Sequence, residues 1–211
     1  VFQVWGGVHP IVAPEDALAE TDAVCVGEGE SVFGPLHQAL EEGRDPTATP
    51  NFWFRREGRI VRNPFHPLHA AEELDRLPPP LYAEGEIIYR RGRGFRPLTT
   101  ADYLRFNSLR YMAVWALGCP YHCTYCSNSR FIANDRGYAH LRHPSVDTLI
   151  REIGRARAKH PHLSSVTFVD DSFIALPMST LEGFAARWKS AVGLPFFVAG
   201  TVFALITFVS Q

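Results

Sequence analysis

The chain has 211 residues, a formal net charge of −1 and a hydrophobic fraction of 46%. The charge balance excludes electrostatic capture of nucleic acid or of an anionic lipid surface as a main function. No window of the sequence holds the roughly 18 uninterrupted apolar residues of a membrane-spanning helix, and the length allows one large globular domain or two small ones.

The first residue is Val1 rather than Met, and residues 1–5 already have the pattern of a strand. No charged segment with a cleavage site precedes them, so we expect no signal peptide and interpret the sequence as an internal fragment of a longer protein. Three of the four cysteines lie close together in the sequence, which is unlike a disulfide scaffold. A reducing, cytoplasmic location is therefore expected.

Residues 1–43 alternate short strands and helices. We expect strands over residues 1–5 and 23–26 and helices over residues 13–20 and 32–42. Ser31 is a candidate cap for the second helix, and short loops between alternating elements indicate a parallel α/β sheet. Cys25 lies in the second strand, where we expect a small buried side chain rather than a metal ligand.

Residues 44–110 differ in kind because eight prolines interrupt them. We interpret this region as an ordered linker between two α/β units, since its aromatic side chains need packing partners. Residues 51–62 are predicted to form a hairpin around Glu57-Gly58, and residues 74–81 are predicted to form an extended tether.

The alternation of strands and helices returns from residue 111. We expect strands over residues 111–117, 165–169 and 195–199, a helix from Ser145 or Asp147 to about residue 159, and a helix over residues 181–192. The apolar face of the first of these helices supports its assignment.

Cys119, Cys123 and Cys126 form a C-x3-C-x2-C run directly after the strand expected over residues 111–117. Three thiolates can hold three corners of an iron–sulfur cube. The fourth iron then has no protein ligand and can bind a small molecule, just as a catalytic metal site keeps one coordination position open. The alternative is a zinc site with His122 as fourth ligand, although zinc patterns normally supply a second ligand pair at a distance.

This run, with Tyr125 before its last cysteine and strand–helix units on either side, resembles the radical S-adenosylmethionine superfamily. The resemblance implies a 4Fe–4S cluster on the three cysteines, in a loop after the first strand of a partial (βα)6 TIM-type barrel. It implies that S-adenosylmethionine chelates the open iron and is cleaved reductively to a 5′-deoxyadenosyl radical. A small-molecule substrate and an electron donor such as flavodoxin or ferredoxin follow from the same resemblance.

The expected second strand of this part ends at Asp170 and Asp171, in the Asp-Asp-Ser-Phe form of one branch of the superfamily. The resemblance implies that one carboxylate accepts a hydrogen bond from the ammonium group of S-adenosylmethionine. The alternative is a pair that caps a helix. Tyr125 and Gly200, the latter at the end of the expected third strand, are further candidates for contact with S-adenosylmethionine.

Residues 5–10 and 22–30 resemble the last third of a Rossmann-like cobalamin-binding domain, which precedes the radical core in one large branch of the superfamily. Glycines after strands allow close approach of a ligand to the backbone. The candidate cobalamin-binding residues are Gly6, Gly7, His9, Gly27, Glu28 and Gly29. His9 is not expected to ligate cobalt, because it does not lie in the Asp-x-His-x-x-Gly motif that supplies such a ligand.

The expected fold class is α/β. Residues 1–43 are assigned to the end of a cobalamin-binding domain, residues 44–110 to a proline-rich linker, and residues 111–211 to a truncated radical S-adenosylmethionine barrel. The uncharged, apolar residues 201–211 do not fit the family. We interpret them as a truncation or frameshift, and expect an exposed third-strand edge that promotes aggregation.

The expected function is that of a cobalamin-dependent methyltransferase or of a radical rearrangement or cyclisation enzyme. One alternative is an enzyme without cobalamin that resembles the methylthiotransferases. The other is a non-catalytic module that binds zinc or an iron–sulfur cluster.

Overall fold

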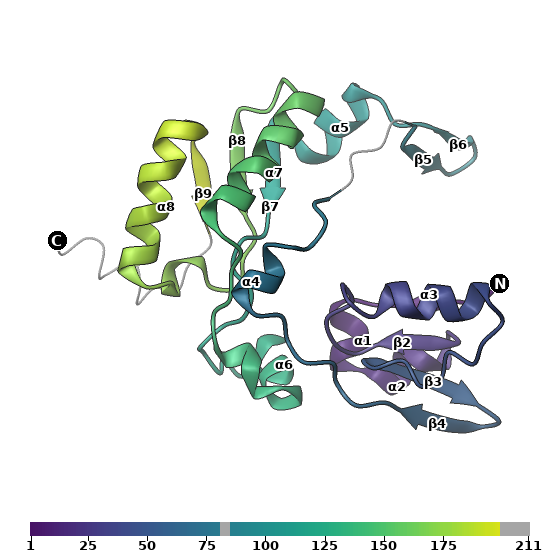
Figure 1. Ribbon diagram of the computed structural model, residues 1–211. Coiled ribbons are helices and arrows are strands. Elements are labelled where there is room, and N and C mark those ends of the chain that lie inside the picture. Colours follow the sequence, from purple (N-terminus) through teal and green to yellow (C-terminus); the bar gives the residue numbers. More distant parts are fainter. Residues whose placement is uncertain (81–84, 199–211) are drawn as a thin grey trace. The chain divides into compact units, whose positions relative to one another are not determined.

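The computed structural model describes residues 1–80 and 85–198. The chain divides into two compact units (Figure 1), and it enters the first of them twice. The first unit contains residues 1–69 and 121–140, and the second contains residues 70–120 and the chain from residue 141 onward. These units differ from the three consecutive ranges 1–43, 44–110 and 111–211 that the sequence suggests.

A four-stranded sheet in the order β1-β2-β3-β4 forms the centre of the first unit. Its strands are β1 (Val4–Trp5), β2 (Ala23–Cys25), β3 (Phe52–Arg56) and β4 (Arg59–Arg62). β1 and β2 are parallel, as expected, and β3 and β4 form the expected hairpin, with φ of 50° at Glu57 and 74° at Gly58. β3 also pairs antiparallel with β2, so this hairpin extends the sheet instead of belonging to a linker.

Helices and one 3-10 turn complete the first unit: α1 (Val8–Val12), α2 (Pro14–Ala19), α3 (Phe33–Glu41), α6 (Asn128–Asn134) and η1 (Arg136–Ala139). Pro14 takes the first position of α2, where its missing N–H costs no hydrogen bond. Ser31 does not cap α3, whose N-cap is Val32. The Ser31 hydroxyl instead lies 2.6 Å from Nε2 of His69.

Both faces of the first sheet are buried, which explains the uninterrupted apolar run of β2. On one face, Ala23 and Cys25 pack with Val32, Leu36 and the ring of Phe52. On the other face lies a second cluster, formed by Val24, Val26, Ala17 and Leu18. Cys25 is 2% exposed, which confirms the expected buried side chain.

The second unit contains a parallel sheet in the order β7-β8-β9, formed by β7 (Arg110–Ala113), β8 (Ser165–Phe168) and β9 (Phe196–Val198). Its other elements are α4 (Ala71–Leu74), β5 (Ile87–Arg90), β6 (Gly94–Pro97), α5 (Thr100–Asn107), α7 (Val146–Lys159), η2 (Phe173–Ala175) and α8 (Met178–Ala191). The three predicted strands and two predicted helices are confirmed, with Ser145 as the N-cap of α7. β7 is shorter than expected, and the chain leaves the ladder after Ala113.

The antiparallel pair β5–β6 and helix α5 occupy sequence that was expected to be linker. Asp102 joins them: its carboxylate accepts hydrogen bonds from Arg96 at 2.6 and 2.7 Å and from Arg90 at 2.9 Å. The same carboxylate accepts bonds from the hydroxyl and backbone N–H of Thr99, the N-cap of α5. The Arg96 guanidinium and Thr99 hold the pKa of Asp102 far below its usual range.

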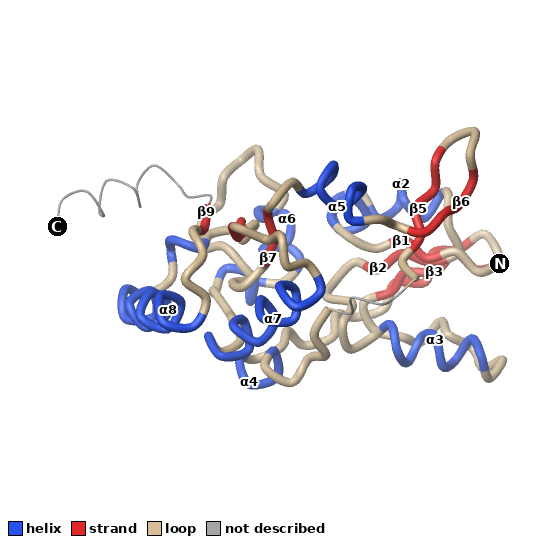
Figure 2. Tube along the Cα trace, turned by 90° about the horizontal axis from the view of Figure 1, so that it is seen from above, coloured by secondary structure: helices blue, strands red, loops and turns tan. Residues whose placement is uncertain are grey.

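α7 and α8 lie on the same side of the β7-β8-β9 sheet (Figure 2). The core between them is largely aromatic: the ring centroids of Trp115 and Phe184 lie 5.1 Å apart, and those of Phe168 and Trp188 lie 5.6 Å apart. Helices between consecutive parallel strands are the repeating unit of a (βα) barrel, so the arrangement matches the expected first part of such a barrel.

The opposite face of this sheet carries exposed apolar side chains, among them Met112, Val114, Val169 and Phe197. Within the described residues, β9 has a strand on only one side. Among the helices of residues 1–80 and 85–198, none is long and apolar enough to span a membrane. The candidate Gly200 and the apolar tail lie outside the described residues.

Candidate functional site

The cysteine run begins at Cys119, six residues beyond the carboxyl end of β7, at the edge of the sheet where parallel α/β folds place their ligands. Leu117 is paired with Arg142, through a bond from the Leu117 N–H at 2.8 Å and one to the Leu117 carbonyl at 3.0 Å. Gly118 follows with φ of 93°, a left-handed conformation that glycine adopts without strain. The turn into the run therefore depends on this glycine.

The three cysteines of the run are free thiols. Cys119 is buried and belongs to the second unit, whereas Cys123 and Cys126 are half-buried and belong to the first. The N–H of Cys126 donates to the Cys123 carbonyl at 3.1 Å, and the Ser129 hydroxyl donates to the same carbonyl at 2.6 Å. The last two cysteines thus lie on a tight turn that leads directly into α6.

This donor set suits an iron–sulfur cluster, because thiolates are soft ligands that iron–sulfur clusters prefer. No three His, Cys, Asp or Glu side chains within residues 1–80 and 85–198 are placed to hold a single metal ion. Metal sites are seldom preformed without their metal, so the fit rests on the chemistry of the three thiols. Cys25 does not join them: it lies in the first core, and burial raises the pKa of its thiol.

The two aspartates after β8 have different surroundings. Asp170 is 6% exposed, and its two carboxylate oxygens accept hydrogen bonds from the backbone N–H groups of Trp115 and Ala116, both at 2.8 Å. Burial raises the pKa of Asp170 to about 6, against the lowering effect of these two bonds. Asp171 is exposed. Of the two, Asp171 is therefore the carboxylate that a ligand can reach.

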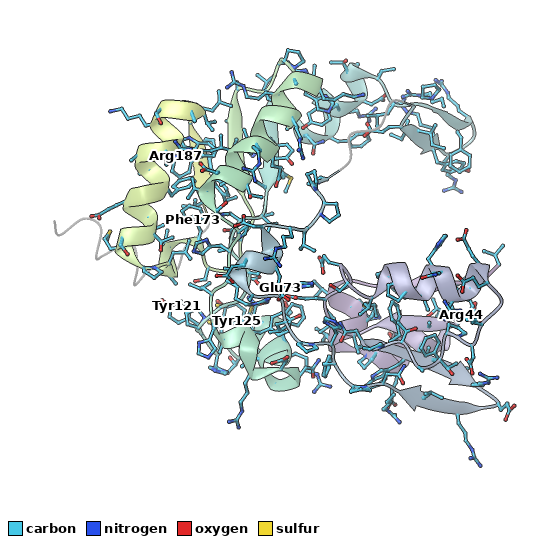
Figure 3. All side chains as sticks on the ribbon, in the orientation of Figure 1. Arg44, Glu73, Tyr121, Tyr125, Phe173 and Arg187 are labelled. Atoms are coloured by element: carbon cyan, nitrogen blue, oxygen red, sulfur yellow. The ribbon has the colours of Figure 1, made fainter. Side chains whose placement is uncertain are left out.

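Side chains around the cysteines are open to solvent. Tyr125 is 91% exposed (Figure 3), and His122 is exposed, as expected. The segment 121–140 also carries exposed Arg130 and Arg136, and its one acidic residue, Asp135, accepts a bond from the backbone N–H of Gly137. The surface of this segment is consequently cationic.

The glycines of the first unit divide into two kinds. Gly7 has φ of 100° and has open space where a Cβ would lie, which leaves room for a ligand. A Cβ on Gly27 would lie 2.7 Å from Cγ of Asn51, and one on Gly29 would lie 2.9 Å from the Phe33 ring. Packing within the unit thus accounts for Gly27 and Gly29 without a ligand.

Glu28 and His9 also have partners within the first unit. The Glu28 carboxylate lies 3.1 Å from Nδ1 of buried His69, whose Nε2 contacts Ser31. His9 lies 3.0 Å from the Asp16 carboxylate, and its ring centroid is 4.9 Å from that of Trp5. Gly6 is exposed at the end of β1, and a Cβ there would make only ordinary contact with Cys25.

Asn51 links several segments of the first unit, and no pattern in the sequence predicts this role. It is 1% exposed and has φ of 63°. Its side-chain amide donates to the Glu28 carbonyl at 2.6 Å, and its side-chain oxygen accepts from the His66 N–H at 2.6 Å. Asparagine tolerates the left-handed conformation better than most residues, but nothing in the local sequence shows that residue 51 adopts it.

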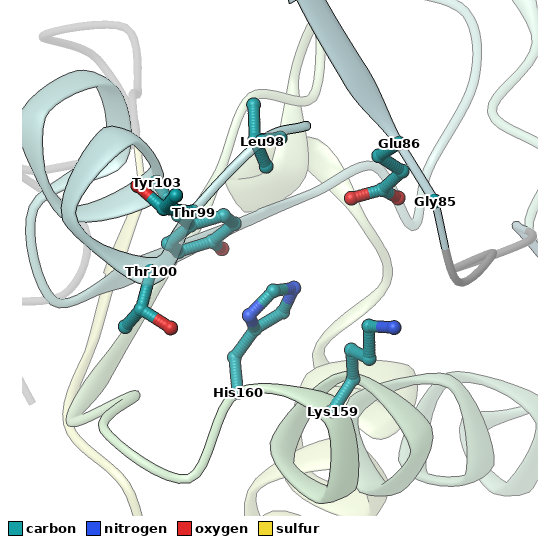
Figure 4. Close-up of a pocket in the computed structure, with 8 residues that line it drawn as sticks. All are labelled: Gly85, Glu86, Leu98, Thr99, Thr100, Tyr103, Lys159 and His160. Carbon is teal, nitrogen blue, oxygen red and sulfur yellow. The ribbon is translucent and has the colours of Figure 1, made fainter. Parts of the chain in front are cut away.

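A small cavity of about 130 Å³ lies at the other end of the second sheet, where α7 ends and α5 precedes β7. Figure 4 shows Lys159, His160, Tyr103 and Glu86 around it, and the rings of His160 and Tyr103 are stacked with centroids 4.1 Å apart. Burial lowers the pKa of His160. This cavity adjoins the amino ends of the strands, away from the edge that leads to Cys119.

The sequence is similar to curated proteins along most of its length. An uncharacterised methyltransferase of Pyrococcus horikoshii is 29% identical over 178 residues, which are 82% of this chain and 34% of that protein. The anaerobic magnesium-protoporphyrin IX monomethyl ester cyclase of Rubrivivax gelatinosus is 28% identical over 138 residues, which are 62% of this chain and 22% of that enzyme. The chain therefore spans about a third or less of these relatives.

The fold is similar to that of solved enzymes. A cobalamin-dependent S-adenosylmethionine radical enzyme, OxsB, aligns with a TM-score of 0.57 and 17% identity over 85% of this chain and 22% of its own. The radical S-adenosylmethionine methyltransferase TsrM of Kitasatospora setae aligns with a TM-score of 0.61 and 19% identity over 90% of this chain and 34% of its own. No family model matches the sequence.

Three lines of observation agree: the three free thiols after the first parallel strand, the relatives in sequence, and the fold shared by both units with cobalamin-dependent radical enzymes. This chain is thus similar in sequence to an uncharacterised methyltransferase and to magnesium-protoporphyrin IX monomethyl ester cyclases, and it shares the fold of radical S-adenosylmethionine enzymes that were solved with cobalamin bound.

Proposed function

We propose that this chain binds a 4Fe–4S cluster through Cys119, Cys123 and Cys126 and holds S-adenosylmethionine at the open iron, as part of a radical enzyme. The observation that carries the proposal is the set of three free thiols directly after the first strand of a parallel sheet. Three ligands leave one coordination position for a second molecule, which distinguishes this site from one that only transfers electrons.

Cys119, Cys123 and Cys126 would hold the cluster, which would pass one electron from an external donor to S-adenosylmethionine, so that its C5′–S bond would break to give methionine and a 5′-deoxyadenosyl radical. The protein has to present three deprotonated thiols, since the thiolate is the ligand. Asp171 is the carboxylate we assign to the ammonium group, because it is exposed while Asp170 is bonded to the backbone. Tyr125 is exposed to solvent, and we assign it as the aromatic side chain beside S-adenosylmethionine.

We assign the first unit to cobalamin binding, with Gly6 and Gly7 as the backbone closest to the ligand. Their exposure and the open space at Gly7 support this assignment. Gly27 and Gly29 lend it no separate support, since internal packing already requires them. The solved structures named for bound cobalamin, OxsB and TsrM, share the fold and provide the analogy.

The reaction that we favour is methyl transfer to a small-molecule substrate, because a curated relative that matches 82% of this chain is named an uncharacterised methyltransferase. A radical cyclisation is the second candidate, and similarity to the protoporphyrin ester cyclases of two bacteria supports it. Both reactions use the same cysteines and the same carboxylate.

An acidic one-electron donor of the flavodoxin or ferredoxin type is the partner that we propose. The exposed side chains of Arg130 and Arg136 follow the cysteines on α6 and η1, and Asp135 is the one acid among residues 121–140. A cationic surface next to the cluster increases the rate of encounter with an acidic protein.

Anaerobic reconstitution with iron and sulfide tests the proposal. We expect a brown protein with about four irons per chain and broad absorption in the blue, which forms 5′-deoxyadenosine when reduced in the presence of S-adenosylmethionine. A chain that takes up one zinc ion and forms no cluster would show the non-catalytic alternative to be right.

A further inference from the structure

The Asp170 carboxylate continues the pairing between β7 and β8 beyond the point where the strands themselves stop. The last backbone bond in this direction runs from the Val169 N–H to the Ala113 carbonyl at 2.9 Å. From there the Asp170 side chain takes over, with one oxygen on the Trp115 N–H and the other on the Ala116 N–H, both at 2.8 Å. Residues 115 and 116 are thus held by a side chain from the neighbouring strand.

We propose that Asp170 is a positioning residue for the iron–sulfur cluster, an inference that rests on the proposed function. Its carboxylate fixes the backbone three residues before Cys119. Leu117 is fixed next, by the paired bonds with Arg142. Gly118 is then the one residue between this anchored segment and the first cysteine. The position of Cys119 therefore depends on the two bonds from Asp170 to the backbone of residues 115 and 116, which we call the clamp.

The ring of Trp115 adds a third anchor to the same segment. Its indole N–H donates to the Pro144 carbonyl at 2.9 Å, and the ring packs against Phe173 and Phe184 with centroids 5.6 and 5.1 Å away. The buried indole ring fixes the position of Trp115, and the Asp170 carboxylate fixes the orientation of its backbone N–H. The clamp therefore controls the direction in which the chain approaches Cys119.

The side chain at position 170 has to accept two N–H bonds, one on each of two oxygens. Among side chains as short as that of aspartate, only a carboxylate has two such acceptors. An asparagine would accept one N–H bond and turn its own NH2 donor toward the other backbone N–H. An alanine would leave both N–H groups buried without a partner, and each such group costs about 1–3 kcal/mol. Asp170 and Asp171 thus divide two tasks, with the first holding the loop and the second facing the ligand.

The test compares four substitutions in the full chain after reconstitution: Asp170→Ala, Asp170→Asn, Asp171→Asn and Val166→Ala. The readouts are the rate at which an iron chelator removes the cluster and the electron paramagnetic resonance spectrum of the reduced cluster. Loss of a group that orients metal ligands typically weakens metal retention about 10–100-fold. We expect both Asp170 variants to lose iron at least about tenfold faster than wild type, with an altered spectrum.

Val166→Ala is the control for general destabilisation, because Val166 is fully buried in the core and pairs with Tyr111 within β7, before the chain reaches the cysteine loop. It should lower the unfolding midpoint while retaining the wild-type spectrum and chelation rate. Asp171→Asn should weaken binding of S-adenosylmethionine and leave cluster retention unchanged. Asp170→Asn, the milder change, keeps the comparison possible where Asp170→Ala does not fold.

Wild-type retention and spectrum in Asp170→Asn would overturn this inference and leave the proposed function intact. Equal loss of the cluster in Val166→Ala and Asp170→Asn would also overturn it, because stability alone would then explain the loss. A wild-type chain that takes up no cluster would overturn the proposed function and this inference together.

Discussion

Two loops of this chain each follow a strand that pairs in parallel with a neighbour, and both carry recognisable motifs, yet their side chains have opposite surroundings. In residues 27–30, Gly27 packs against Asn51 and Glu28 contacts buried His69. In residues 118–126, the thiols are free and Tyr125 is 91% exposed. When the residues of a motif have hydrogen-bonding and packing partners within the protein, those contacts explain the motif. When its reactive side chains lack such partners, the motif is a candidate site for a ligand.

The same contrast separates Asp170 from Asp171, which are adjacent in sequence. Asp170 has both oxygens bonded to backbone donors, and Asp171 is exposed. The two aspartates therefore have different roles, although they belong to one motif. Substitutions at residues with internal partners and at residues without them should accordingly have different consequences.

The largest effect is expected from Cys123→Ala, which should abolish the cluster and the cleavage of S-adenosylmethionine together. Cys25→Ala is the matched control, since it removes a buried thiol of the first core and should cost about 1 kcal/mol of stability while leaving the cluster intact. Iron content and absorption after reconstitution measure both variants. Loss of the cluster in Cys25→Ala would contradict the assignment of this thiol to the core.

Asn51→Ala is expected to cost about 3 kcal/mol in the unfolding free energy of the first unit, because it leaves two part-buried backbone groups without their partner and places alanine at positive φ. Asn51→Gly separates the two contributions, since glycine accepts this φ without strain. Denaturant titration measures both variants. Equal losses in the two variants would mean that the backbone conformation contributes nothing.

Gly27→Ala is expected to cost about 1–3 kcal/mol through overpacking against the Asn51 side chain. The cost should largely disappear in the Asn51→Gly background, where no side chain lies opposite, so a double-mutant cycle measures the coupling. Independent effects of the two substitutions would show that Gly27 is needed for something other than Asn51, and would restore the case for a ligand at this glycine.

Asp75→Ala is expected to have the smallest effect, about 1 kcal/mol, because Asp75 bonds to the N-cap residue Ser145 and to Thr148 in the first turn of α7. The Thr148 hydroxyl, followed by Ser145, lowers the pKa of Asp75 from its ordinary value of 3.8. The stabilisation is therefore complete above that ordinary value and is lost as pH falls through the lowered one. Unfolding titrations of both proteins should differ at pH 7 and converge in strong acid.

Much of the fold could be read from the sequence, because local patterns dictate it. An apolar face at helical spacing located α7, Ser145 was one of two candidate starts for it, and Glu57-Gly58 marked the hairpin turn. The boundaries of the units could not be read in this way. β3 joins β2 through bonds between residues about 30 positions apart, and α6 returns to the first unit from far along the chain.

The order of residues was enough to locate the candidate site: three cysteines at a spacing that suits a cluster with one open iron, after a strand and next to a glycine that permits the turn. Which neighbouring residues a ligand can reach depends instead on contacts made across the fold. Asn51, His69 and the backbone of residues 115 and 116 reach their partners across the fold. Such bonds depend on distance in space and on desolvation, and neither leaves a local trace in the order of residues.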